Sequence, residues 1–158
     1  MKKLLSIILT TILLISLFSI TTYAQSPEII ISETTDYSED GSSITTTVTQ
    51  LASNDLTRAT KTITGSKTKT VKNGDGDVLY KFKVTGTFTV NEGVSATCTA
   101  VSCSASNLAS GWSLDSSTKS KSGNKATATG VFKYTVLFIS TTQETTATLT
   151  CDKNGNLS

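Results

Sequence analysis

Three cysteines, Cys98, Cys103 and Cys151, are the residues whose chemistry and spacing are most informative in this sequence. In an exported chain, three cysteines allow one disulfide and one remaining thiol, with three possible pairings. Cys98 and Cys151 each continue the apolar alternation of the residues two and four positions before them, so both sulfurs are expected to face a core from different strands. We therefore predict a Cys98–Cys151 disulfide, worth about 3–4 kcal/mol by loop entropy, and a free thiol at Cys103.

Histidine is absent from the whole sequence, which removes Ser-His-Asp and Cys-His catalysis as well as His-ligated zinc. Cys103 has no histidine or cationic cluster near it in the sequence to lower the pKa of its thiol. Glycoside hydrolysis needs two carboxyl groups across a cleft, but every acid here falls in an expected turn, at a strand end or in the acidic N-terminal segment. We expect no catalytic residue and no cofactor, and a carboxylate-based hydrolase is the third and weakest functional hypothesis.

Two clusters of oxygen ligands could attract calcium, one in Asn73–Asp77 and one in Asp152–Asn156. Neither cluster has the following glycine and the distant glutamate of an EF-hand loop. Hairpin-turn chemistry explains the first cluster, and solvation of the chain end explains the second. We expect no metal site, and weak calcium binding at Asp75 and Asp77 stays open.

The N-terminus has the pattern of an export signal. Lys2 and Lys3 precede an apolar stretch over 4–20, and Thr22-Tyr23-Ala24 offers small residues at the positions that a signal peptidase reads. We predict a signal peptide over 1–24 and a secreted product, with an uncleaved anchor as the alternative. Loss of Lys2 and Lys3 leaves 14 − 2 = 12 basic against 12 acidic residues. Nucleic acid is therefore not expected as a partner, nor is a membrane after signal cleavage.

The elements that must position these residues are predicted to be strands throughout. Serine and threonine dominate the mature chain, proline occurs once, and two long segments, Val78–Val90 and Ala126–Phe138, place apolar side chains at alternate positions. A Ser/Thr-rich disordered stalk is the competing interpretation, but stalks lack such long alternating runs. We predict an all-β, antiparallel β-sandwich of about eight or nine strands. An acidic segment with a possible hairpin (25–57) precedes the sandwich core (58–158).

Aromatic residues on the alternating segments share the parity of the apolar core, so they are not expected to form a sugar platform. Trp112 differs because it follows a Ser-rich loop over 103–111. An exposed tryptophan beside polar groups favours carbohydrate stacking, so Trp112 is the predicted ligand contact.

Several motifs resemble those of an uncharacterised family of small secreted proteins of Gram-positive gut bacteria, classed as a domain of unknown function. They are Arg58–Thr62, Val84–Phe88, Ala96–Thr99, Ser122–Ala128 and Leu149–Cys151. The resemblance covers the chain from about residue 44 onward and implies that both Cys98 and Cys151 belong to the family pattern, whereas Cys103 departs from it. It implies no activity, cofactor or ligand.

A looser resemblance links the chain to immunoglobulin-like sandwiches. The order Cys98, Trp112, Cys151 follows the Cys, Trp, Cys order of those domains, although Leu149 stands where the tyrosine corner would place a tyrosine. This resemblance supports a sandwich core.

Absence of catalytic groups and Thr-rich outer faces favour a non-enzymatic secreted protein that binds an extracellular glycan or protein surface. The alternative hypothesis is a structural or assembly protein that pairs through an exposed edge strand. The apolar stretch Val136–Ile139, which is hydrophobic at both parities, motivates that alternative.

Overall fold

The structure is a computed structural model that describes residues 27–52 and 60–158. The expected signal peptide (1–24) and the boundary expected at residues 57 and 58 lie outside the described residues. The described chain forms eight strands: β1 (Glu28–Tyr37), β2 (Ser43–Leu51), β3 (Thr60–Lys72), β4 (Val78–Asn91), β5 (Ser95–Ser106), β6 (Trp112–Ser122), β7 (Lys125–Val136) and β8 (Ile139–Thr150). Within these residues there is no helix, and hence none that could cross a bilayer.

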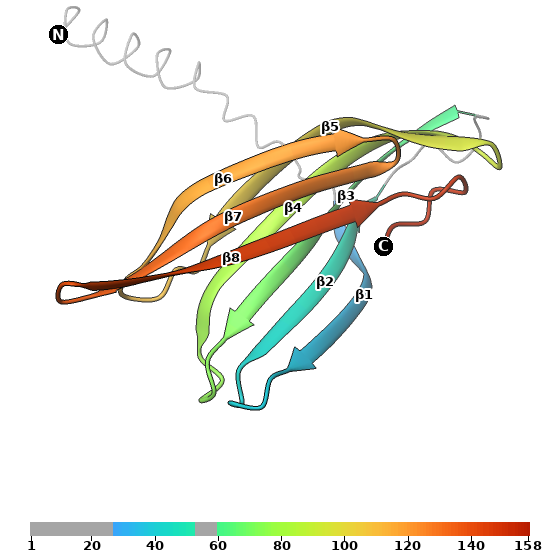
Figure 1. Ribbon diagram of the computed structural model, residues 1–158. Helices are drawn as coiled ribbons and strands as arrows, with labels where there is room; N and C mark the ends of the chain where they lie inside the picture. Colours follow the sequence, from blue (N-terminus) through green and yellow to red (C-terminus); the bar gives the residue numbers. More distant parts are fainter. Residues whose placement is uncertain (1–26, 53–59) are drawn as a thin grey trace, which may run out of the picture.

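The strands build two antiparallel sheets in which each strand pairs with its neighbour in the sequence. Sheet A has the order β1-β2-β3-β4-β5, and sheet B has the order β6-β7-β8. Figure 1 shows sheet B lying across one face of sheet A. The predicted all-β antiparallel sandwich is confirmed, with eight strands.

The core lies between the two sheets and is built from the alternating residues of β4 and β7. Tyr80 and Phe132, both fully buried, stack with ring centroids 3.7 Å apart, and Phe82 meets Phe132 edge-on at 5.7 Å. Burial of these large rings supplies the main hydrophobic driving force for joining the sheets. From Tyr80 onward the inward parity predicted for β4 holds, because these even-numbered residues are all buried: Tyr80, Phe82, Val84, Phe88 and Val90. Val78 was predicted on the same face but is only half-buried, and it lies beyond a register shift in the pairing of β3 with β4.

A register shift between Thr87 and Phe88 interrupts the pairing of β4 with β5, one residue beyond Gly86. A Cβ at Gly86 would lie within 3 Å of the Phe88 ring and the Ala126 methyl group, so the packing of the sheets requires glycine there. The extra residue is Thr99, so the bulge lies in β5, whereas β3 and β4 pair through Gly86 without a shift. The shift also lets residues of opposite parity in β5, Cys98 and Cys103, both pack toward the core.

Two expectations about neighbouring segments are wrong. The Ser-rich segment after Cys103 is not all loop, because β5 continues to Ser106. Val136 and Phe138 were expected to face the core, but both are exposed. The β7–β8 hairpin extends past the rest of the molecule on the left of Figure 1, so its end has nothing to pack against.

Candidate ligand-binding face

The candidate site is the outer face of sheet A, which points away from sheet B. The register of the sheet places hydroxyl and charged side chains there in cross-strand rows. One row joins Glu33, Thr47, Thr68 and Lys83, and the next joins Thr35, Thr45, Thr70 and Lys81. Threonine suits such positions because its branched side chain fits the pleat and its hydroxyl remains available for hydrogen bonds.

An ion pair shows that this face is concave. The Lys83 ammonium donates to a Glu28 carboxylate oxygen at 2.7 Å, although Lys83 lies on β4 and Glu28 on β1. In a flat sheet, three strand spacings would separate these backbones by about 14 Å. The two side chains meet because the sheet curls toward its outer face.

A cavity of about 450 Å³ occupies the concave face near the β1–β2 and β3–β4 turns. We call it the threonine trough. Its lining side chains come from four adjacent strands: Glu33, Thr35 and Tyr37 of β1, Ser43, Thr45 and Thr47 of β2, Thr70 and Lys72 of β3, and Val78 and Lys81 of β4.

Side-chain hydrogen bonds hold part of the lining in place. The Thr35 and Thr45 hydroxyls lie 3.0 Å apart, and the Thr47 hydroxyl donates to a Glu33 carboxylate oxygen at 3.1 Å. Further along the same face, the buried hydroxyls of Thr49 and Ser66 are 2.8 Å apart. These bonds orient donors and acceptors before any ligand arrives, which lowers the entropic cost of binding.

Tyr37 is the aromatic residue of the trough, and its side chain is 79% exposed. The sequence prediction missed it, although Tyr37 continues the parity of Glu33 and Thr35 up to an acidic turn. An exposed aromatic ring beside hydroxyl groups provides a stacking surface for a sugar.

Trp112, the predicted ligand contact, lies elsewhere. Its ring sits 5.1 Å from Tyr80 and 5.2 Å from Tyr134, half-buried at one end of the core. Trp112 belongs to sheet B, whereas the trough opens on the opposite side of sheet A. The structure therefore does not bring Trp112 together with the trough residues.

The expected Cys98–Cys151 disulfide is not formed in the structure, where all three cysteines are thiols. Cys98 and Cys151 are buried, and Cys103 is half-buried against the core. The backbone N–H groups of Cys98 and Cys151 donate to the consecutive carbonyls of Gly123 and Asn124, at 2.8 and 3.0 Å. The β6–β7 turn thus ties β5 to the end of β8 beside both thiols.

Burial governs the ionisation of the two buried thiols, Cys98 and Cys151. Desolvation, with a smaller contribution from the Asp152 carboxylate, raises the pKa of Cys151 from its ordinary 9.0 to about 11. Desolvation likewise raises the pKa of Cys98. Both shifts disfavour the nucleophilic thiolate.

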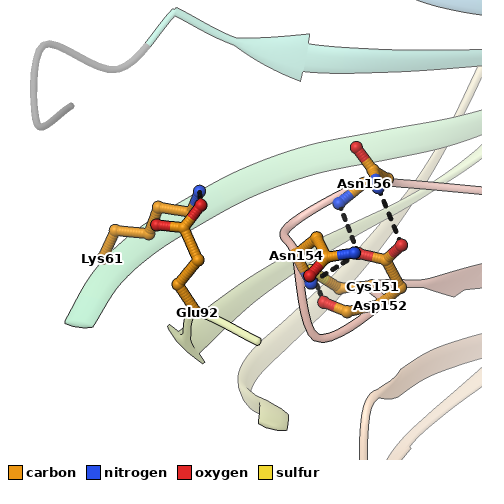
Figure 2. Close-up of polar contacts among 6 residues, drawn as sticks. All are labelled: Lys61, Glu92, Cys151, Asp152, Asn154 and Asn156. Atoms are coloured by element: carbon orange, nitrogen blue, oxygen red, sulfur yellow. Dashed lines mark hydrogen bonds and ion pairs between the residues drawn. The ribbon is translucent and has the colours of Figure 1, made fainter. Parts of the chain in front are cut away.

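The two clusters considered for calcium serve as turn caps. The Asn73 side chain accepts the backbone N–H groups of Asp75 and Asp77 at 3.1 and 2.8 Å. Figure 2 shows the second turn, where Asp152 accepts the N–H groups of Asn154 and Asn156, both at 2.8 Å. Over 27–52 and 60–158, no three His, Cys, Asp or Glu side chains gather as metal ligands would.

The shifted carboxyl groups do not resemble a general acid. A hydrogen bond from the Asn156 side chain, followed by backbone hydrogen bonds, lowers the pKa of Asp152. Hydrogen bonds from Ser42 lower the pKa of Asp40 in the same way. A catalytic acid at neutral pH needs the opposite shift.

Comparison with protein-family models, with curated proteins and with solved structures gives no significant match for this chain. The resemblances to a secreted bacterial family and to immunoglobulin-like domains stay predictions. What the structure itself provides is a concave polar face with a defined cavity.

Proposed function

We propose that the protein is secreted, performs no catalysis and binds an extracellular glycan in the threonine trough. The observation that carries this proposal is the cavity of about 450 Å³, lined by hydroxyl groups, two lysines and an exposed tyrosine. Binding sites for small ligands commonly have volumes of about 300–1,000 Å³. Rows of hydroxyl donors and acceptors match the hydroxyl groups of a sugar, and the Tyr37 ring offers a stacking face.

Charge in the trough favours a glycan that carries carboxylate groups. Lys72 and Lys81 line the cavity together with one carboxylate, Glu33, which already accepts a hydrogen bond from Thr47. A sugar carboxylate would gain charge-assisted hydrogen bonds from the lysine ammonium groups. Binding should therefore weaken as ionic strength rises.

The proposal includes the Cys98–Cys151 disulfide in the secreted protein. Its support is that both thiols are buried and that their backbones are tethered to consecutive carbonyls of one turn. Oxidation would join the two sulfurs and pass two electrons and two protons to a disulfide of an extracytoplasmic thiol oxidase. The predicted signal peptide over 1–24 would deliver the chain to that compartment.

Titration calorimetry on the purified exported protein tests the glycan proposal, with oligogalacturonate as the acidic sugar and an uncharged galactan as its neutral counterpart. Oligogalacturonate is expected to bind more tightly than the galactan. Tyr37→Ala and Lys81→Gln should each weaken binding by about tenfold, since a stacking contact or a charge-assisted bond contributes about 1–2 kcal/mol.

Thr129→Val is the matched control, because it removes a threonine hydroxyl from the outer face of sheet B, far from the trough. It should leave the affinity unchanged. Absence of binding to both sugars, or equal loss in Thr129→Val and in the trough variants, would contradict a glycan site. Retention of a host protein by the wild type and its loss in Tyr37→Ala would reassign the trough to a protein ligand.

A second candidate function, assembly through an edge strand, is favoured by β1. This strand ends sheet A, all of its residues are exposed, and three consecutive isoleucines, Ile29–Ile31, are among them. Unpaired edges of this kind can add a strand from another chain. Analytical ultracentrifugation over a wide concentration range tests it: a strict monomer, unchanged by Ile30→Lys, would exclude self-assembly through β1.

A further inference from the structure

The end of the β7–β8 hairpin exposes four consecutive apolar side chains, which we call the apolar tip. Their exposed fractions are 46% for Val136, 87% for Leu137, 102% for Phe138 and 74% for Ile139. The hairpin carries them beyond the rest of the molecule (Figure 1). Contiguous exposed apolar groups in a soluble fold usually mark an interaction site.

Backbone geometry shows that the turn itself does not favour these residues. Leu137 has a φ of +53°, in the left-handed region that bulky residues rarely adopt. A two-residue hairpin turn with a positive φ at its first position normally uses glycine there. The stability of the hairpin therefore does not explain why leucine occupies position 137. An interaction of the leucine side chain with a partner would explain it.

The apolar tip is too small for a protein interface. A specific protein–protein contact buries about 800 Å² on each partner and involves about 20–30 residues a side. The tip offers four side chains at the convex end of a narrow hairpin, with Leu108 of the neighbouring β5–β6 loop as a further exposed apolar residue. The hydrocarbon region of a lipid bilayer is fluid and apolar, so it can accommodate such a tip without a complementary pocket.

Behind the tip lies a pair of aromatic residues of the kind found at membrane surfaces. Tyr134 and Trp112 contact each other with centroids 5.2 Å apart, and Lys133 is the one charged residue between positions 126 and 143. Tryptophan and tyrosine prefer the water–lipid interface. Val136 stands two residues beyond Tyr134, or about 7 Å along the strand. That distance matches the 5–10 Å depth of interfacial apolar groups.

We propose that the apolar tip inserts into the interfacial region of a lipid bilayer, with Trp112 and Tyr134 at the headgroup level. This inference is independent of the glycan proposal, because the tip and the trough are at different places on the molecule. It departs from the expectation of no membrane partner, which considered only net charge. Insertion of the tip depends on apolar contact, so it needs little charge attraction.

Vesicle flotation of the purified exported protein tests the proposal. The probes are vesicles of zwitterionic phosphatidylcholine alone and of phosphatidylcholine with phosphatidylglycerol. The wild type should float with both, with weak dependence on salt. Trp112 is the one tryptophan of the chain, so its emission should shift to the blue when vesicles are added.

The informative variant is Leu137→Gly combined with Phe138→Asn, because glycine followed by asparagine suits this turn better than Leu-Phe and the fold should remain intact. Binding to vesicles should fall at least about tenfold, and the blue shift should disappear. Val94→Asn is the matched control, since Val94 is 70% exposed in the β4–β5 turn at the opposite end of the sandwich. It should bind as the wild type does.

Three outcomes would overturn the proposal. In the first, the wild type does not float. In the second, the tip variant floats as well as the wild type, as it would if another segment carried the binding. In the third, the wild type is a dimer in solution that the tip variant converts to a monomer, while neither binds vesicles, which would make the tip a contact between copies.

Discussion

The outer faces of the two sheets carry the same kind of sequence but have different structures. On sheet B, threonine hydroxyls pair across exposed strands, as between Thr129 and Thr146 at 2.8 Å. On sheet A, a similar pair, Thr49 and Ser66, is buried. Sheet A also curls into the threonine trough and closes an ion pair from β1 to β4.

The difference arises from the number of strands and from curvature. Sheet B has three strands, whereas sheet A has five, and β1 reaches far enough over the outer face for Glu28 to meet Lys83. A row of threonines becomes a candidate site only where a wide, curved sheet surrounds it. Threonine content alone does not distinguish a solvent-facing row from a binding surface.

The largest expected effect comes from the aromatic core that joins the two sheets. Phe132→Ala should lower the free energy of unfolding by about 3–5 kcal/mol, because it empties the space between Tyr80 and Phe82. Urea denaturation followed by Trp112 fluorescence measures this change. Phe138→Ala, which removes an exposed ring from the same hairpin, should change stability by less than about 0.5 kcal/mol. Equal effects of the two variants would contradict the observed burial.

The next comparison concerns the two hydroxyl pairs directly. Thr49→Val leaves the buried Ser66 hydroxyl without its partner and should cost about 1–3 kcal/mol. Thr129→Val breaks an exposed pair and should stay within about 0.5 kcal/mol. Adding Ser66→Ala to Thr49→Val should restore part of the loss, since no buried polar group is then left unsatisfied. Equal losses of stability in Thr49→Val and Thr129→Val would show that the hydroxyl pairs on the two sheets contribute equally, and would contradict the difference in burial.

Alkaline pH tests the region where β5 meets the end of β8. The pKa of Cys151 is raised to about 11 in the folded protein, so the unfolded chain releases this proton first as the pH rises above 9. The contribution of this group to the free energy of unfolding is fully present below pH 9, and about 1–2 kcal/mol of it is lost between pH 9 and pH 11. Thermal unfolding of the reduced protein against pH, with Cys151→Ala as control, measures it.

The same titration distinguishes the thiol and disulfide forms of the protein. A Cys98–Cys151 disulfide has no proton to lose, so the oxidised protein should lack this alkaline dependence. Peptide mapping without reduction identifies the bond. A bond from Cys103 to either of the other cysteines would contradict the predicted pairing.

The smallest expected effect comes from the ion pair across the concave face. Glu28→Gln should cost about 0.2–1 kcal/mol, and less at high salt, because both side chains are partly exposed. Lys83→Met should give a similar loss. An effect that does not change with salt would mean that the pair contributes through packing instead of charge.

Alternation in the sequence predicted the core of β4 and the sandwich well, because burial on one face imposes a period of two on a strand. It could not predict curvature, so the trough and Tyr37 were missed. It also failed at Val136 and Phe138, where the apolar alternation continues into the end of a hairpin that extends beyond the rest of the molecule (Figure 1). Cys103 packs toward the core because, beyond the register shift at Thr87, the odd-numbered residues of β5 face inward in place of the even-numbered ones. The local sequence pattern does not predict this shift.

Each strand pairs only with its predecessor and successor, and sheet A is complete before the chain reaches β6. Pairing partners are therefore close in sequence, which favours rapid, stepwise assembly. If the protein is secreted as proposed, the chain would leave a translocation pore with its hairpins in the order in which they pair, and sheet A would be able to form while β7 and β8 are still inside the pore. The hydrophobic side of sheet A would stay uncovered until β7 and β8 arrive, which makes that interval the period of greatest exposure to aggregation.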